Sequence, residues 1–600
     1  MIYRRLNINL TQYCFKIMKI KHLFGLAVIA AMTASCSSNE DLGTAGPGTG
    51  TNEAGVGYAT FTINLPSVSG TRAADADGAD MNEGTEDEYK VSDATALIFQ
   101  KYGADEGSYK FVESVILPVT ATDWEDDATV GITTKSKKLV AKLTNVDTKN
   151  TYGVLVLLNN NITGGGVKIE LPTAGQSYND WNKTVLSPDL TELAKTGEFY
   201  MANAPLNDAG KVTTLVTIDK DKIYATEALA KANTSADVYV ERGVAKMTVV
   251  APGTKTVMDK ANPTVATKSE VTFSNWALDI TNKKTYAVHN IDGLSKDFPA
   301  IWTTEKRFTG TNNRVYWGKD PNYDLTVLKE PNKTGDDKRD EEFNFIDATS
   351  KIDKDFTNTT KTNPVYCLEN TFNLTNMYQG QTTRVIFKAT YTPKDDEGNS
   401  LADKGGTFYT IGNMKTILKE ADLEAAVNAA ATSTLSGCTV DYKRFKTEEG
   451  SHVITLADIK DADGKPLVAG TDYSGKTGTV IVDEINTKLG LKAGRPEEMV
   501  GINTYLEGAT YYIARVKHFG DALTQWNSGE SYGDNNKLYL GRYGMLRNNW
   551  YELQVGNVYG PGYPGVPPVD PNQPDDENEK YLSVSVKILS WAKRSQSVDL

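Results

Sequence analysis

The chain has 600 residues, of which 39% are hydrophobic and 24% are charged, a composition typical of a globular protein with more than one domain. Its formal net charge is −13, which gives no basic surface for nucleic acid, so we expect no nucleic acid partner. The 30 Tyr and 50 Gly residues, with frequent Thr and Val, favour an all-β fold with many turns.

The N-terminal segment has the organisation of a signal peptide. A short basic stretch beginning at Met18 precedes an apolar run at residues 23–34, which is too short to span a bilayer. Small residues then lead to Cys36, and this ending resembles the lipobox at which bacterial lipoproteins are cleaved and acylated. We therefore expect residues 1–36 to be a lipoprotein signal peptide with its true start at Met18, and a lipid on Cys36 to anchor the precursor in the outer membrane.

The next segment alternates between apolar and polar residues. Residues 56–66 predict a half-buried β-strand whose apolar face carries Ala59, Phe61, Ile63 and Leu65. A polar loop of small and acidic residues follows and contains Arg72 and Ala73. Proteases cut such loops, and Arg suits the S1 pocket of a trypsin-like enzyme. We expect cleavage between Arg72 and Ala73, which makes residues 37–72 a propeptide.

Short strands recur through the body of the chain, and a new domain is expected to begin near residue 238. The expected domains are therefore β-rich units at residues 73–237 and 238–559. An Ala-rich segment at residues 422–432 predicts a helix within the second of them. The strands expected in the two units are 94–100, 111–117, 138–143, 151–158, 270–278, 383–391 and 510–516.

The C-terminal end consists of a linker and a final strand. Residues 560–580 are rich in Pro and acidic residues, so they favour extended geometry and cannot pack a core. Residues 581–600 then form an amphipathic strand, with a change of phase at Leu589; its apolar positions are Leu582, Val584, Val586, Ile588 and Trp591. A single strand with an apolar face is unstable in water. It must fold back onto its own domain or pair with another molecule, and the sequence leaves both alternatives open.

The two amphipathic strands have similar patterns at opposite ends of the chain. If cleavage after Arg72 removes the first, its domain is left with an apolar groove that residues 581–600 of a second copy can fill. Such a head-to-tail contact builds a filament rather than a closed ring. Alternation alone predicts that a charge at Val586 weakens assembly far more than a charge at Ser585.

These features together resemble the type V fimbrilins of Bacteroidales, and most closely the shaft subunit of short fimbriae. The matching segments are the lipobox, Arg72, the Pro-rich linker, residues 240–246 (VERGVAK), residues 546–551 (LRNNWY) and residues 582–600. The resemblance implies two transthyretin-like β-sandwich domains, an Arg-specific trypsin-like protease, and a C-terminal donor strand that polymerises through Leu582, Val584, Val586, Ile588 and Trp591.

The resemblance also implies where the protein acts and what it meets. We expect a precursor exposed at the cell outer membrane and a mature subunit in the fimbrium. The implied partners are other copies of the chain, accessory fimbrial subunits, and ligands on host or bacterial surfaces, in adhesion and biofilm formation.

Other functions remain as alternatives. A non-polymerising surface lipoprotein that binds glycans would share the lipobox and the β-domains, and a fimbrial anchor or tip subunit would share most of the chain. A hydrolase needs a nucleophile or carboxylate constellation, and the sequence contains no HExxH motif. We expect no enzyme activity, no metal and no cofactor. Cys367 and Cys438 are either isolated thiols, which we favour, or a disulfide.

Overall fold

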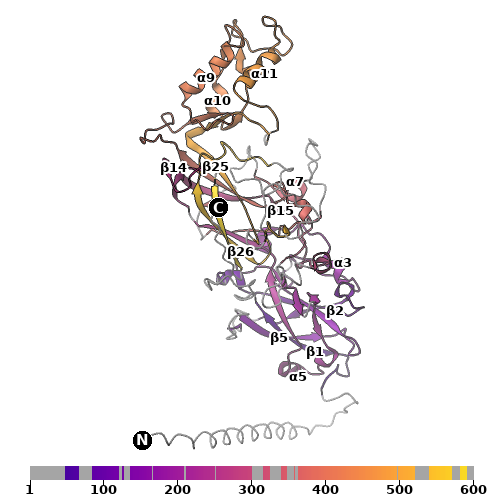
Figure 1. The fold of residues 1–600 in the computed structure, drawn as a ribbon. Coiled ribbons are helices and arrows are strands. Elements are labelled where there is room, and N and C mark those ends of the chain that lie inside the picture. Colours follow the sequence, from indigo (N-terminus) through magenta and orange to yellow (C-terminus); the bar gives the residue numbers. More distant parts are fainter. Residues whose placement is uncertain are drawn as a thin grey trace, which may run out of the picture. The chain divides into compact units, whose positions relative to one another are not determined.

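The computed structural model of the chain describes residues 48–65, 84–119, 124–126, 135–164, 166–208, 211–250, 252–299, 315, 317–324, 339–346, 357–358, 363–495, 498–519, 524, 539–569 and 582–590 (Figure 1). Strands dominate these residues, and the helices are few and short, so the expected all-β class is confirmed. No helix within this described part is long and apolar enough to cross a membrane.

The first sheet has nine strands: β1 (Gly57–Asn64), β2 (Ala94–Gln100), β3 (Lys110–Leu117), β4 (Glu125–Asp126), β5 (Lys135–Leu143), β6 (Tyr152–Leu158), β7 (Met201–Asn203), β10 (Val216–Ile218) and β11 (Ala236–Arg242). Their order is β3-β2-β6-β7-β11-β1-β5-β4, with β10 beside β6. Associated elements are α2 (Glu86–Tyr89), α3 (Tyr178–Asn182), α4 (Leu190–Leu193), α5 (Glu227–Ala232) and the hairpin of β8 (Leu206–Asp208) and β9 (Lys211–Thr213).

The interior of this sheet is uniformly apolar. Every residue of β6 and nearly every residue of β2 is buried, which explains why these strands show no alternation in sequence. The two ends of the sheet are tied together, because the carboxylate of Glu113 in β3 accepts hydrogen bonds from the backbone N–H of Thr144 and Asn145, just after β5. The enclosed side chains form one continuous core.

The second sheet also has nine strands: β12 (Ala245–Val250), β13 (Thr254–Met258), β14 (Ala266–Asp279), β17 (Thr357–Asn358), β18 (Val365–Cys367), β19 (Arg384–Thr392), β25 (Ala509–Arg515), β26 (Asn549–Val558) and β27 (Leu582–Ser590). The order is β18-β12-β26-β13-β14-β19-β25, with β17 beside β14 and β27 beside β26. It has its own core. Smaller neighbouring elements are α6 (Leu294–Asp297), α7 (Arg339–Glu342), β15 (Thr281–Asn282) and β16 (Phe343–Asn344).

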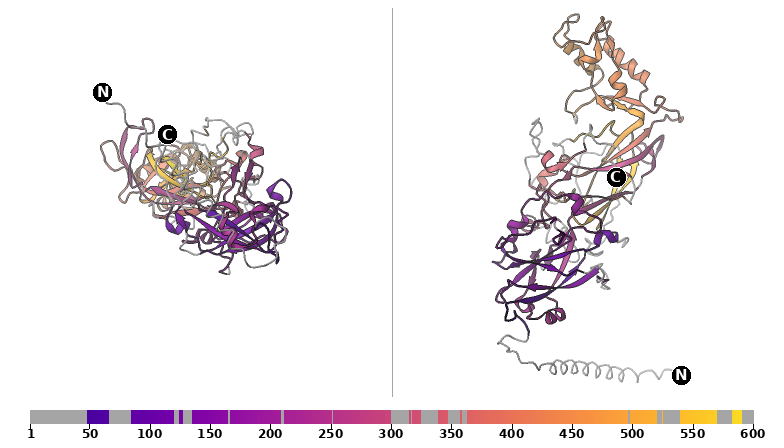
Figure 2. Two further views of the ribbon diagram at one scale, coloured as in Figure 1. Left: turned by 90° about the horizontal axis from the view of Figure 1, so that it is seen from below. Right: turned by 180° about the vertical axis from the view of Figure 1, so that it is seen from behind.

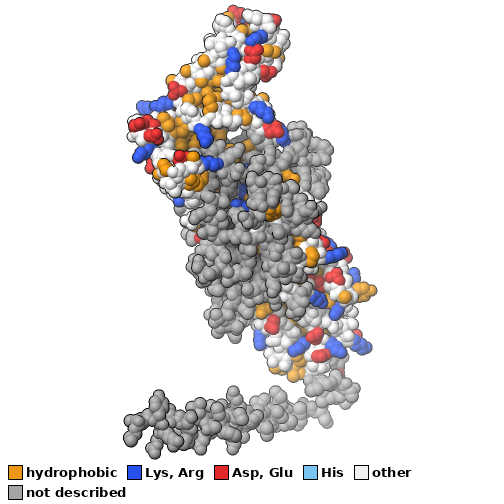
Figure 3. All heavy atoms as spheres, in the orientation of Figure 1, with side chains coloured by type: hydrophobic (Ala, Val, Ile, Leu, Met, Phe, Trp, Pro, Cys, Tyr) orange, Lys and Arg blue, Asp and Glu red, His pale blue; other side chains and the backbone are white. Residues whose placement is uncertain are grey.

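Between β19 and β25 the chain leaves the second sheet and forms a separate small core, which we name the insert (residues 403–508). It contains β20 (Phe408–Ile411), α9 (Glu420–Thr432), β21 (Thr439–Val440), α10 (Lys443–Thr447), β22 (Gly450–His452), β23 (Ile459–Lys460), α11 (Gly478–Lys488) and β24 (Ile502–Tyr505). Its orange helices lie together in Figure 2. Charged side chains of both signs are interspersed over the face of the insert seen in Figure 3.

The organisation differs from the expected one in two respects. The change from the first sheet to the second falls between Arg242 and Ala245 rather than before residue 238, because Val238 and Val240 belong to the first core. The second expected domain also contains the insert, since the helices α9 and α11 bury their apolar side chains against each other and against β20 instead of joining the large sheet.

Candidate strand-exchange site

Strand β1 lies inside the first sheet, between two partners. It runs parallel to β11, with Phe61 opposite Ala236 and Ile63 opposite Val238, and antiparallel to β5, with Thr62 opposite Lys138. Figure 1 shows β1, β5 and α5 side by side. Because both of its edges are paired, removal of β1 would leave an open slot between β5 and β11.

The apolar face of β1 is completely enclosed. Ala59, Phe61 and Ile63 are 0% exposed and Leu65 is 2% exposed, and all of them belong to the first core. Full burial of a side chain such as Phe, Ile or Leu stabilises a fold by about 1.5–3 kcal/mol. A domain without β1 would therefore expose a strongly apolar groove.

The opposite face of β1 is partly enclosed as well. Thr60 is 1% exposed, and its hydroxyl donates a hydrogen bond of 2.6 Å to the carbonyl oxygen of Ala230 in α5. Its backbone N–H donates to the Ser235 hydroxyl at 3.0 Å, and its carbonyl accepts from the Ser235 N–H at 2.7 Å. Asn64, on the same face, is 6% exposed. The expected half-buried strand is thus buried on both faces at these two positions.

The start of β1 is also fixed. The backbone of Tyr58 exchanges two hydrogen bonds with Tyr224, at 2.8 and 2.9 Å. Gly57 approaches Ile223 so closely that a Cβ atom would lie 2.6 Å from its Cγ2 atom. The strand therefore occupies its slot along its whole length.

The C-terminal strand β27 has a single ladder among the described residues. It pairs antiparallel with β26 of its own chain, with Val586 opposite Leu553 and Ile588 opposite Tyr551. Leu553 and Tyr551 belong to the second core. Of the two alternatives that the sequence leaves open, the structure has the strand folded back onto its own domain.

Residues 240–246 and residues 546–551, two of the segments on which the resemblance rests, meet at the end of β11. The guanidinium of Arg242 donates to the Glu88 carbonyl oxygen at 2.7 Å and to the Asn548 side chain at 3.3 Å. The ammonium of Lys246 pairs with the Glu88 carboxylate at 2.7 Å, and burial lowers the pKa of this lysine. Arg547 pairs with Glu369 at 3.1 Å. These side chains are all buried, so residues 240–246 and 546–551 have a structural role.

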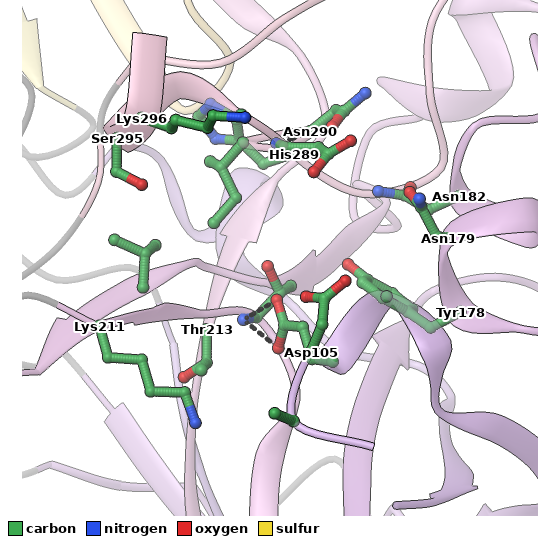
Figure 4. A pocket seen from close by; sticks show the side chains of 18 residues that line it. Asp105, Tyr178, Asn179, Asn182, Lys211, Thr213, His289, Asn290, Ser295 and Lys296 are labelled. Carbon is green, nitrogen blue, oxygen red and sulfur yellow. Dashed lines mark hydrogen bonds between the residues drawn. The ribbon is translucent and has the colours of Figure 1, made fainter. Parts of the chain in front are cut away.

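A polar pocket of about 370 Å³ lies beside β9, α3 and α6 (Figure 4). Glu106 lines this pocket and accepts hydrogen bonds from the backbone N–H of Thr214 and Leu215, and burial raises the pKa of this carboxyl to about 7. Within the described residues no group of three potential ligands for a metal ion occurs. Cys367 and Cys438 are free buried thiols, in agreement with the favoured expectation.

The other residues singled out from the sequence fall as follows. Cys36, Arg72, Ala73 and Trp591 lie outside the described residues. Leu582, Val584, Val586 and Ile588 lie in β27, where the structure defines their backbone pairing. Thr60 and its helix α5 were not predicted, because the sequence between them gives no signal of their contact.

The chain is similar to fimbrial proteins. Its residues 503–597, which include β26 and β27, match the family model described as major fimbrial subunit protein type IV, fimbrillin, C-terminal. This part of the chain is therefore similar to the C-terminal domain of fimbrial subunits. The resemblance to Bacteroidales fimbrilins is confirmed.

Two solved structures from Parabacteroides distasonis are also similar. A candidate cell adhesion protein has 12% identity and a TM-score of 0.36, over 90% of this chain and 98% of that chain. A fimbrial assembly protein has 15% identity and a TM-score of 0.23, over 39% of this chain and 67% of that chain. Both TM-scores are below 0.5, so neither structure decides the fold or the function. The sequence has no match among curated proteins.

Proposed function

We propose that this chain is the precursor of a fimbrial shaft subunit. It is exported as a lipoprotein acylated on Cys36, cleaved between Arg72 and Ala73, and polymerised when residues 581–600 of one subunit replace β1 of the next. Each of its two large sheets forms a transthyretin-like β-sandwich domain. The protein has no enzyme activity. Its filaments serve adhesion and biofilm formation at the cell surface.

The observation that carries the proposal is the position of β1. This strand is paired along both edges, with β5 and with β11, and its apolar face is completely buried, yet it precedes Arg72 in the chain. After cleavage at Arg72 it is held by non-covalent contacts alone. Before cleavage it occupies the slot as part of the same molecule, at a high effective concentration, so the precursor stays monomeric.

The distribution of arginine supports selective cleavage. Five arginines of the described part are at most 4% exposed: Arg242, Arg384, Arg515, Arg542 and Arg547. Arg444 lies in α10 and pairs with Asp458 at 2.6 Å, and Arg495 precedes a proline, which trypsin-like enzymes do not cut. Exposed lysines, such as Lys138 and Lys142, are common by comparison. Among the side chains that the structure describes, arginine therefore offers a trypsin-like protease fewer sites than lysine does.

The pairing of β27 supports its role as the donor. Among the described residues, β27 pairs with β26 alone, antiparallel and along one edge. The Pro-rich linker precedes β27 in the chain. A strand that is paired along one edge can detach without opening the sheet beneath it. The energy lost at β26 is regained when the strand enters a slot with two partners.

Two variants test the assembly. Arg72→Ala should block maturation and leave a monomer, whereas deletion of residues 581–600 should permit cleavage and stop growth. Electron microscopy and N-terminal sequencing of the products separate these outcomes. Normal filaments from the cleaved deletion variant would rule out the donor role of the C-terminal strand.

Lipid attachment is tested separately. Replacing Cys36 with Ala should abolish labelling of the precursor by a radioactive fatty acid, with a Cys438→Ala variant as the control that keeps its label. Unchanged labelling of the Cys36 variant would show that the lipid is elsewhere or absent.

A further inference from the structure

We propose that the groove left by β1 accepts the donor strand in one register, in which Ser585 replaces Thr60 beneath helix α5. This inference rests on the proposed strand exchange and names the residues that set its specificity. The groove demands a small hydroxyl side chain at that position, because the slot is closed on both faces there.

The position of Thr60 is the most selective in the groove. Its side chain lies between β1 and α5, is 1% exposed, and donates to the Ala230 carbonyl oxygen at 2.6 Å. That carbonyl lies in the last turn of α5 and also accepts a hydrogen bond from the backbone N–H of the C-cap residue Asn233 at 3.1 Å. A charged side chain there would be buried without a partner, which is costly.

Within β27, three residues of the polar face can take the place of Thr60 in the direction of β1. They are Ser583, Ser585 and Lys587. A slip by one residue would turn the serines toward the apolar core and is excluded by the period of the strand. The register with Lys587 buries a charge beneath α5 and is excluded as well.

Asn64 distinguishes the two remaining registers. This position is 6% exposed. With Ser583 at Thr60, Lys587 takes the place of Asn64 and is buried. With Ser585 at Thr60, Leu589 takes the place of Asn64 instead. Leu589 is the residue at which the alternation of the C-terminal strand changes phase, so an apolar side chain stands where the groove is closed on the face opposite the core.

The register with Ser585 also fits the core positions within β1, and of the core positions only that of Leu65, just after β1, receives a polar residue, Ser590. Val586 takes the place of Phe61 and Ile588 that of Ile63, so aliphatic side chains enter the core. Lys587 takes the place of Thr62, which is only half-buried and has Asp237 as its partner in β11 and Lys138 as its partner in β5.

The reverse direction of the donor strand places a lysine in a buried position in every in-phase register. With Ser585 at Thr60, Lys580 would replace Leu65, and with Ser583 at Thr60, Lys580 would replace Ile63. These two residues are 2% and 0% exposed. The donor strand therefore runs parallel to β11, as β1 does.

Disulfide cross-linking between subunits tests the register. Lys138 is exposed and lies directly opposite Thr62, and opposite residues of antiparallel strands are close enough for a disulfide. Lys138→Cys is combined in turn with Ser583→Cys, Ser585→Cys, Lys587→Cys and Leu589→Cys, and filaments are oxidised. Maturation removes Cys36, and Cys367 and Cys438 are buried, so the background is low.

The account predicts that the Lys138→Cys, Lys587→Cys pair alone links neighbouring subunits. Linking through Ser583→Cys, Ser585→Cys or Leu589→Cys overturns the proposed register, while strand exchange survives in each case. Filaments without any link contradict both the register and the exchange beside β5.

Charge substitutions give a second readout. Ser585→Asp should slow filament growth by at least about 10-fold, because its carboxylate would be buried beneath α5. Ser583→Asp, which takes the half-buried place of Tyr58, should slow it far less. Equal effects of the two variants would contradict the proposal. Alternation alone had placed Ser585 among the tolerant positions.

Discussion

The buried ion pair of Glu88 and Lys246 joins helix α2 to residues 240–246. The Glu88 carboxylate also accepts a hydrogen bond from the Tyr366 hydroxyl at 2.6 Å, and the Lys246 ammonium lies 3.9 Å from the centre of the Trp550 ring. Both charged side chains are at most 4% exposed. Neither can be hydrated if its partner is lost.

We expect Lys246→Met to destabilise the folded protein by about 3–5 kcal/mol, because it leaves a buried carboxylate without its counter-ion. Thermal and urea unfolding measure the effect. Lys231→Met is the matched control, since Lys231 pairs with Glu227 at 2.6 Å on the surface, with 62% and 54% of the two side chains exposed. A Lys246 variant as stable as this control would show that the pair contributes nothing.

The raised pKa of Glu106 predicts the direction in which the stability of the folded protein changes with pH. Burial raises the pKa of its carboxyl from 4.5 to about 7, so the folded state holds a proton that the unfolded state loses at lower pH. Its contribution to stability is therefore present below pH 4.5 and is lost as the pH rises through about 7. The midpoint of thermal unfolding should fall over this range in the wild type. Glu106→Gln should remove that slope, and a parallel slope in the variant would contradict the assignment.

At the scale of residues, sequence patterns located one face of β1 and not the other. Alternation identified Ala59, Phe61 and Ile63 as core residues, and they are completely buried. It placed Thr60 on the solvent face, because a period of two carries no information about a helix more than 160 residues away. Contacts between distant segments are set by the fold, so the selective position of the groove could not be predicted.

At the scale of elements, we propose that strand β1 is present in the precursor and leaves the subunit when the filament assembles. We expect Phe61→Ala to lower the stability of the first domain in the precursor by about 3–5 kcal/mol, since it opens a cavity in the core. Mature filaments of the same variant should unfold like the wild type, because β1 has left them. Leu97→Ala, in the permanent strand β2, is the control that should weaken both. A loss of stability in Phe61→Ala filaments would mean that β1 stays in place.

Helices of the insert show why some elements were foreseen and others were not. The Ala-rich segment before residue 432 predicted α9 nearly to its ends. Helix α11 contains the run Thr479, Val480, Ile481 and Val482, whose β-branched side chains favour strands. Tertiary packing overrides that preference, because Ile481 and Ile485 lie in the core of the insert and Thr477 caps the helix by accepting from the Val480 N–H.

At the scale of the whole molecule, each of the two large sheets holds one of the two strands for which we propose exchange. The first sheet holds β1 in a slot with two partners, and the second sheet holds β27 along one edge. The sequence predicted both strands from their period. Their partners were not predictable, since pairing between strands hundreds of residues apart leaves no local pattern.

The most direct test of this account is to ask whether residues 37–72 leave the protein during assembly. Precursor is cleaved with an Arg-specific protease, filaments are separated from monomer by sedimentation, and both fractions are examined by mass spectrometry. We predict that filaments contain the chain from Ala73 and lack the fragment that ends at Arg72 and carries the lipid on Cys36. The cleaved variant without residues 581–600 should remain monomeric and retain the fragment. Filaments that keep the fragment in equal amount to the subunit would contradict strand exchange.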